Sequence, residues 1–173
     1  MYVVGLSADT FFQYSLSTGW DLSTASYDSV SFSVRSQDGA PLGSTFNSDG
    51  TKLYFSGGIN DSVYQYSLST AFDLSTASYD SVSFSVASQE GNPQGLFFNP
   101  DGTKLFLNGR NSDAVHQYSL STAFDLSTAS YDNVSFGFLS QDGNSTGISF
   151  NNTGSKLYMI GYSSCVIYQY STT

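Results

Sequence analysis

The chain has 173 residues, and its fourteen acidic and five basic side chains give a formal net charge of −9. This balance lacks the electrostatic footprint of a nucleic-acid-binding protein, and anionic membrane surfaces repel it. A single cysteine excludes an internal disulfide framework, and no apolar run approaches the roughly 18 residues of a membrane-spanning helix. We therefore expect no nucleic-acid partner and no membrane insertion.

A ten-residue segment, called the clasp below, recurs through the chain. It occupies Ala71–Asp80, returns unchanged at Ala123–Asp132, and appears at Gly19–Asp28 with Gly-Trp in place of Ala-Phe, 52 residues apart each time. The flanking residues follow in register, which divides a single domain, 1–173, into repeats 1–51, 52–103 and 104–155 and a partial repeat 156–173. A period of about 50 residues is typical of propeller blades.

The second repeat predicts four strands. Residues 52–56 form a short aromatic strand that ends at two glycines, and residues 63–68 alternate with tyrosine and leucine on one face. Residues 81–86 alternate strictly between polar and apolar, the clearest strand signal in the chain, and 94–98 form the last strand. Residues 99–103, Asn-Pro-Asp-Gly-Thr, predict a turn, because proline presets φ and glycine accepts positive φ.

These features predict an all-β fold. Four strands joined by short connections favour a β-propeller of four-stranded antiparallel blades, with about 52 residues per blade. Helices are not expected, because no sustained 3.6-residue periodicity exists. The main rival is a parallel β-helix, but its coils are shorter and rarely contain a ten-residue connection.

The turn motif carries a family resemblance. Phe-Asn-x-Asp-Gly-Thr-Lys-Leu-Tyr occurs at Phe46–Tyr54 and, ending in phenylalanine, at Phe98–Phe106. It resembles the turn-and-strand signature of WD40-like and YVTN-type propeller repeats, and the whole unit is similar to repetitive propeller stretches of marine bacterial and phage proteins. The resemblance implies a propeller fold and transfers no catalytic residue.

The number of repeats predicts an incomplete ring of fourteen strands. The first blade lacks its inner strand and the last lacks its rim strand, so apolar blade faces remain at both ends. The chain could close alone as a small four-bladed ring, two chains could complete a ring of seven or eight blades, or the sequence could be a fragment of a longer array. We favour the homodimer, because a symmetric ring covers both faces at once.

The acidic residues follow the repeat. All fourteen fall into five columns, and we interpret them as turn chemistry copied with the repeat. Strand direction brings two sets of loops together at one end of every blade, called the variable end because the copies diverge there. As a hypothesis, these loops form repeated ligand-binding pockets that contain Asp9, Gln37, Asp38, Asn60, Asp61, Gln89, Glu90, Asp113, Gln141 and Asp142.

Three residues are unique to one copy. Trp20 occupies the column of Phe72, so we interpret it as a larger plug at a structural position. His116 takes a column filled elsewhere by Phe or Tyr, which indicates packing space rather than a general base. Cys165 replaces a turn aspartate and has no partner for metal binding or nucleophilic catalysis.

The sequence therefore predicts a non-enzymatic binding module, with no cofactor and no metal, that recognises a glycan or protein through the repeated loops. The ligand is expected on a cell or virion surface; the sequence does not fix the location of the protein, and we suspect that it is extracellular or virion-associated. Calcium in these loops has weak support, because no Asp-x-Asp-x-Asp loop occurs. The alternative is a structural spacer or assembly element of a larger surface or tail-fibre-like protein. An enzyme that uses the central channel would need a unique polar cluster.

Overall fold

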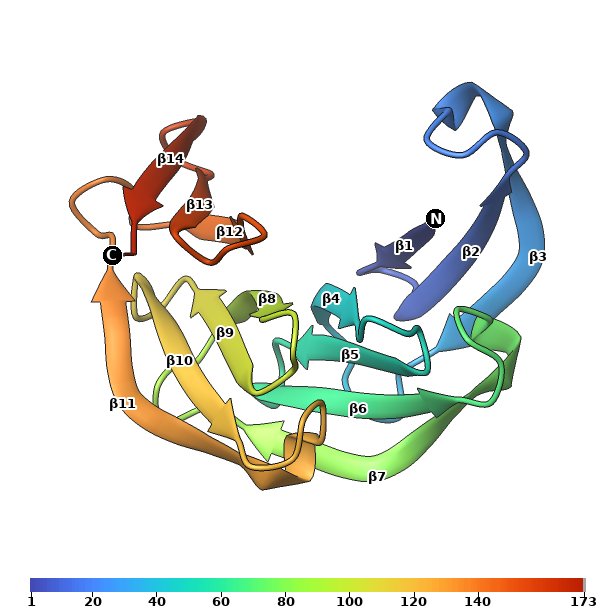
Figure 1. Cartoon of the computed structure of the whole chain (residues 1–173), viewed down its shortest axis with the longest axis horizontal. Helices are drawn as coiled ribbons and strands as arrows, with labels where there is room; N and C mark the ends of the chain where they lie inside the picture. Colours follow the sequence, from blue (N-terminus) through green and yellow to red (C-terminus); the bar gives the residue numbers. More distant parts are fainter. Residues whose placement is uncertain (173) are drawn as a thin grey trace.

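A computed structural model describes residues 1–172 and shows four antiparallel sheets arranged in an open arc (Figure 1). The first sheet contains β1 (Tyr2–Gly5), β2 (Thr10–Leu16) and β3 (Ala25–Ser33). The second contains β4 (Pro41–Phe46), β5 (Lys52–Gly57), β6 (Ser62–Leu68) and β7 (Ala77–Ser85). The third contains β8 (Pro93–Phe98), β9 (Lys104–Gly109), β10 (Ala114–Leu120) and β11 (Ala129–Gly137), and the fourth contains β12 (Ser145–Phe150), β13 (Lys156–Gly161) and β14 (Val166–Ser171).

This architecture confirms the predicted β-propeller. Each sheet is one blade whose strands follow one another as an antiparallel meander. The first blade lacks an inner strand and the fourth lacks a rim strand, as the repeat count predicts. The arc leaves a gap between the first and fourth blades (Figure 1), so one chain does not close into the small four-bladed ring.

Three apolar cores hold the arc together, one between each pair of adjacent blades. Phe11, Leu53 and Tyr66 are buried between the first and second blades. The second core contains Leu105 and Tyr118, and the third contains Met159. Strand alternation explains this arrangement, because each blade is apolar on both faces and packs one face on each neighbour.

The clasp links the second and third blades to the blades before them. Leu74 and Leu126 are almost completely buried, and each begins a three-residue 3₁₀ turn, Leu74–Thr76 or Leu126–Thr128. The Leu74 amide donates to Gln13 Oε1 of the preceding blade at 2.9 Å. The Leu126 amide donates to Gln65 Oε1 at 2.8 Å. Burial of the leucine and pairing of its amide therefore occur together at the first two blade junctions.

The end of the clasp differs from the prediction. Its last four residues are the beginning of the rim strand, which starts at Ala77 rather than at Ser81. A bulge between Tyr79 and Val82 hides this continuity in the sequence, because Asp80 and Ser81 have no partner on β6. Ser81 has a φ of 58°, a left-handed conformation that few residues other than glycine adopt.

The bulge gives one acidic column a structural role. Asp80 accepts hydrogen bonds from Gln65 Nε2 at 2.7 Å and from Lys52 Nζ at 3.1 Å. This contact leaves Gln65 Oε1 directed at the Leu126 amide of the next clasp. The aspartate therefore orients the glutamine that holds the neighbouring blade, and it does not lie in a turn as predicted.

Close approach of the inner strands requires glycine at one position. A Cβ atom on Gly43 would lie 2.2 Å from the backbone oxygen of Gln94 on the next blade, which cannot move away without shifting β8. We predict that Gly43→Ala lowers the free energy of unfolding by about 1–3 kcal/mol through overpacking. The same column contains Gly147, where the nearest atom would be 4.0 Å from the added Cβ. Urea unfolding of Gly147→Ala should show little loss, and equal losses in both variants would contradict the close approach.

The described residues contain no helix long and apolar enough to cross a membrane.

Candidate functional site

The variable end of each blade is formed by two loops. One is the turn between the second and third strand positions, such as 58–61, and the other joins a rim strand to the next inner strand, such as 86–92. Backbone hydrogen bonds connect them, because Val34 donates to Asp9 O at 2.9 Å and Val86 donates to Asp61 O at 2.8 Å. Phe138 makes the same bond to Asp113 O. The structure therefore brings the two predicted loop sets together at each of the first three blades.

Three of the predicted carboxylates bind the protein's own backbone. Asp38 accepts the amide of Asn60 at 2.9 Å, and Asp142 accepts the amide of Ser164 at 2.6 Å. Glu90 accepts the amides of Asn92, Asn111 and Ser112. All three acids are buried. The hydrogen bonds from Ser164 lower the pKa of Asp142 despite its partial desolvation. These carboxylates fix the turns, so their oxygens are occupied.

The turn aspartates differ from one copy to the next. Asp9 pairs with Arg35 Nη1 at 2.8 Å, whereas Asp61 and Asp113 have no such cation because Ala87 and Leu139 replace the arginine. Burial raises the pKa of Asp61, and the charges of Glu90 and Asp38 raise it further. Burial likewise raises the pKa of Asp113, followed by the charges of Glu90 and Asp142.

The predicted amides have mixed surroundings. Asn60 Nδ2 donates to the Gln37 carbonyl at 3.0 Å, and Gln37 Oε1 accepts the Tyr66 hydroxyl at 2.6 Å. Gln141 accepts the Tyr168 hydroxyl through its backbone oxygen. Gln89 is half-buried. Most of these amide residues therefore form hydrogen bonds that hold the loops of the variable end against each other and against neighbouring strands.

The junction of the third and fourth blades contains a group of polar side chains around Arg110. Arg110 follows β9 and places its guanidinium carbon 5.5 Å from the centroid of the Tyr162 ring on the next blade. The Tyr162 amide donates to the Asn144 carbonyl at 2.8 Å, and Asp113 closes the turn that Arg110 opens. We call Arg110, Asp113, Asn144 and Tyr162 the mouth cluster; Arg110 directly follows β9, and Asn144 directly precedes the inner strand β12.

Three atoms of the mouth cluster are shielded and unpaired. Arg110 Nε, Asp113 Oδ1 and Asn144 Oδ1 have no hydrogen-bond partner among residues 1–172. Buried polar groups in proteins are almost always paired, so a concentration of unpaired ones calls for water or a ligand. Sequence reasoning missed Arg110 and Asn144. The available signal was the column Leu6, Gly58, Arg110 and Tyr162, in which each copy has a different residue type.

His116 lies beside this cluster in a hydrogen-bonded chain. Its Nε2 is 2.8 Å from Ser112 Oγ, which in turn bonds Glu90. Because Ser112 donates to the carboxylate, His116 must donate through Nε2, so its buried Nδ1 carries a lone pair. Burial lowers the His116 pKa, which the Glu90 charge partly opposes, so the ring is neutral at pH 7. The glutamate is on the serine side, so the order differs from a Ser-His-acid triad.

Metal ligands are not gathered at this end. No group of three or more His, Cys, Asp or Glu side chains among the described residues is arranged to hold a metal ion.

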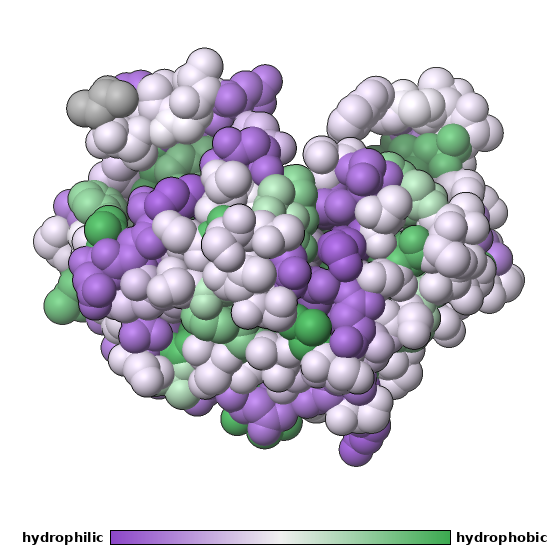
Figure 2. Space-filling view, turned by 60° about the horizontal axis from the view of Figure 1, so that its bottom comes forward, coloured by the Kyte–Doolittle hydropathy of each residue, from purple (hydrophilic) through white to green (hydrophobic). Residues whose placement is uncertain are grey.

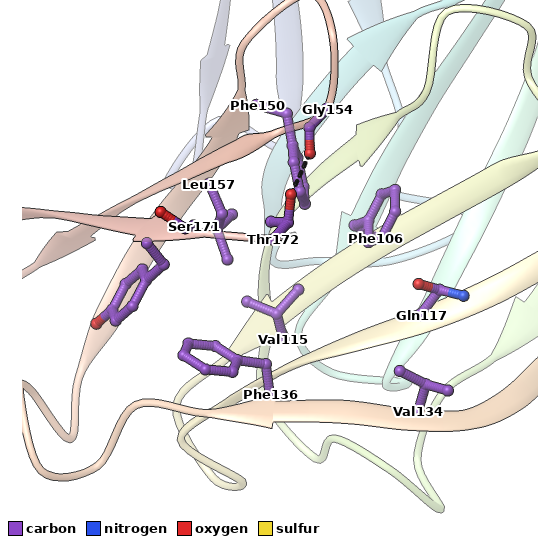
Figure 3. Close-up of a pocket in the computed structure, with 11 residues that line it drawn as sticks. Phe106, Val115, Gln117, Val134, Phe136, Phe150, Gly154, Leu157, Ser171 and Thr172 are labelled. Atoms are coloured by element: carbon purple, nitrogen blue, oxygen red, sulfur yellow. Dashed lines mark hydrogen bonds between the residues drawn. The ribbon is translucent and has the colours of Figure 1, made fainter.

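A separate cavity of about 580 Å³ also lies between the third and fourth blades (Figure 3). Phe106, Gln117 and Phe136 line it, and they match Tyr54, Gln65 and Phe84 in the previous repeat, which surround the third clasp. The cavity therefore has the lining of a clasp site. Thr172 reaches into it and donates to the Gly154 carbonyl, as Figure 3 shows.

Neither a protein-family model nor a curated protein sequence matches the chain. Solved structures do match. A proposed 6-phosphogluconolactonase from Bacteroides fragilis aligns with 99% of this chain and 47% of its own length, with 14% identity and a TM-score of 0.69. A periplasmic gluconolactonase from Pseudomonas aeruginosa aligns with 99% of this chain and 46% of its own, with 13% identity and a TM-score of 0.68.

A non-lactonase structure also matches. The Swd1 β-propeller domain from Myceliophteria thermophila aligns with 95% of this chain and 49% of its own length, with 14% identity and a TM-score of 0.56. The chain thus spans about half the length of the solved structures that it resembles. These likenesses support the propeller fold.

The comparisons correct the predicted function. The sequence predicted a non-enzymatic binding module or a spacer, largely because the repeats showed no unique polar cluster. The two lactonase-named structures have higher TM-scores than the Swd1 domain, so the likenesses give no support to a non-enzymatic module. Within the mouth cluster, Arg110 has no cationic counterpart in the other repeats, whereas Asp113 matches Asp61 and Asn144 matches Asn92.

Proposed function

We propose that the chain is half of a propeller that hydrolyses sugar lactones, with the substrate at the mouth cluster. The observation that carries the proposal is the alignment of nearly the whole chain with lactonase propellers. The mouth cluster adds a cation and a carboxylate within one four-residue turn, between β9 and β10. The motif Phe98–Phe106 supports a closer resemblance to YVTN-type repeats of marine bacterial and phage proteins. That resemblance implies no enzymatic activity.

In this proposal Asp113 is the general base and Arg110 the electrophile. Water attacks the lactone carbonyl carbon while Asp113 takes one of its protons, and a guanidinium N–H of Arg110 stabilises the oxygen that becomes negative. The ring C–O bond then breaks, and the proton on Asp113 passes to the departing oxygen. The raised pKa of Asp113 makes its carboxylate a stronger base for the first step.

The charge of the protein favours an uncharged lactone. The net charge is −9, and Arg110 lies in a turn that also contains Asp113. A phosphorylated lactone adds negative charge, and phosphate recognition normally uses several arginines, lysines or helix N-termini. We therefore infer that D-glucono-1,5-lactone is a better substrate than its 6-phosphate.

Proton release in a weakly buffered solution of D-glucono-1,5-lactone tests the proposal. We expect hydrolysis above the spontaneous rate, and Arg110→Ala should lower kcat/KM by about 100-fold or more, the usual cost of removing an oxyanion donor. Since Asp113 must be ionised to act, kcat should rise with pH through its raised pKa, and Asp113→Asn should remove that limb.

The matched control is Arg35→Ala, which removes a cation from the same end of the first blade. Its kcat/KM should equal that of the wild-type protein. A wild-type rate equal to the spontaneous rate would contradict the proposal, and so would equal losses in the two arginine variants.

A further inference from the structure

The two ends of the arc expose apolar faces. The leading face is the outer side of the first blade, where Leu22 is 70% exposed and Val3 and Tyr27 are 44% exposed. The trailing face is the outer side of the fourth blade, where Ile160 is 49% and Ile167 is 68% exposed. Figure 2 shows the open gap between the two ends, with hydrophobic residues visible beside it. The matching faces of the two middle blades are buried between blades.

The internal blade junctions show how a trailing face is covered. At each of the first two junctions, a glutamine on the earlier blade accepts the amide of a clasp leucine, and a tyrosine hydroxyl donates to the carbonyl of a clasp phenylalanine. The tyrosines are Tyr2, which bonds Phe72, and Tyr54, which bonds Phe124. The phenylalanines adopt left-handed φ values of 62° and 59°, which present this carbonyl to the earlier blade.

The end faces carry the two halves of this junction. In the repeat register, Tyr158 matches Tyr2 and Tyr54, and the exposed Gln169 matches Gln13 and Gln65. On the leading face, Trp20 has the same left-handed φ, 67°, and is fully exposed. The Leu22 amide has no acceptor within residues 1–172. The donor and acceptor groups therefore exist on opposite ends of one chain.

We propose that a second copy of this chain closes the ring head to tail, with its first blade packed on the trailing face. Leu22 of each copy then packs against Tyr158 and Ile167 of the other, and its amide bonds Gln169. A cavity of about 390 Å³ on the trailing face, lined by Ile148, Tyr158 and Ile167, receives the apolar side chains of the leading face.

Two further observations favour this occupant. The chain spans about half of each structure that it resembles, so two copies supply the length of a whole ring. The tyrosine that bonds a clasp carbonyl is replaced by Phe106 on the third blade, where no clasp among the described residues occupies the clasp site. On the trailing face the same column again contains a tyrosine, Tyr158. The hydroxyl is thus present where the second copy would need it.

Light scattering across a concentration series, with the full chain, tests the proposal. We expect the wild-type protein to have twice the mass of one chain. Leu22→Asp and Ile167→Asp should each raise the dimer dissociation constant by about 30-fold or more, because a charge replaces an apolar anchor in a desolvated interface. Both side chains are exposed in the single chain, so the fold should be unaffected and circular dichroism should be unchanged.

The matched control is Leu139→Asp, since Leu139 is 68% exposed but lies in a loop of the variable end. This variant should remain a dimer. An equimolar mixture of Leu22→Asp and Ile167→Asp should recover dimers, because one intact interface forms between the unmodified faces of the two variants. A monomeric wild-type protein, a dimer that survives Leu22→Asp, or a mass that grows without limit would each overturn the proposal.

Discussion

Leu126→Ala should lower the free energy of unfolding by about 2–5 kcal/mol, the range for removing a large buried aliphatic side chain. Leu126 has no exposed surface and lies in the core between the second and third blades, beside Tyr54 and Leu105. The clasp backbone stays anchored by the Leu126 amide, so the cavity cannot collapse easily. Urea-induced unfolding followed by tyrosine fluorescence and circular dichroism measures the loss.

The chain provides its own control for this prediction. Leu22 occupies the same column of the repeat with the same neighbours in sequence, but it is 70% exposed. In a monomeric sample Leu22→Ala should change the free energy of unfolding by less than about 0.5 kcal/mol. Similar losses for Leu22→Ala and Leu126→Ala would mean that the clasp leucine does not stabilise the arc by docking on the preceding blade.

Glu90→Ala should be the second strongly destabilising change, with a loss of about 3 kcal/mol or more. The buried carboxylate accepts three backbone amides and the Ser112 hydroxyl, and its removal leaves these donors unpaired. An unsatisfied buried donor costs about 1–3 kcal/mol. Unfolding in urea measures this loss, and amide hydrogen exchange at Asn111 and Ser112 should accelerate at the same time.

Ser88→Ala is the matched control, because Ser88 is exposed in the same loop two residues before Glu90. Its free energy of unfolding should stay within about 0.5 kcal/mol of the wild-type value. If Glu90→Ala were as stable as Ser88→Ala, the glutamate would be available for another role, as the sequence hypothesis held.

The repeat made most of the fold predictable. Period-two alternation at 81–86 and the turn at 99–103 located the strands and their order, and counting copies placed the missing strands at the two ends. The bulge at Asp80 and Ser81 was not predictable. Neither residue is a glycine or proline, and the left-handed φ of Ser81 is imposed by the pairing of β6 with β7 rather than by local propensity.

The site was less predictable than the fold for two physical reasons. Placement of acidic residues in loops followed from the sequence, but the capture of Glu90 by backbone amides depends on how adjacent blades pack. The copies visibly diverge at Arg110, but the predicted ligand-binding residues come from the repeated acidic and amide columns, which leave out a single cation. The grouping of Arg110 with Tyr162 and Asn144 depends on how the fourth blade packs against the third, which the sequence does not show.

Amide hydrogen exchange of Leu22, Leu74 and Leu126 tests most directly the claim that this half-ring has complementary ends. Leu74 and Leu126 should be protected at every protein concentration, because each amide is bonded within the chain. Leu22 should be protected in concentrated solution and should lose this protection on dilution, as the second copy dissociates. Fast exchange of Leu22 at all concentrations would contradict ring closure, and fast exchange of Leu74 and Leu126 would contradict the arc itself.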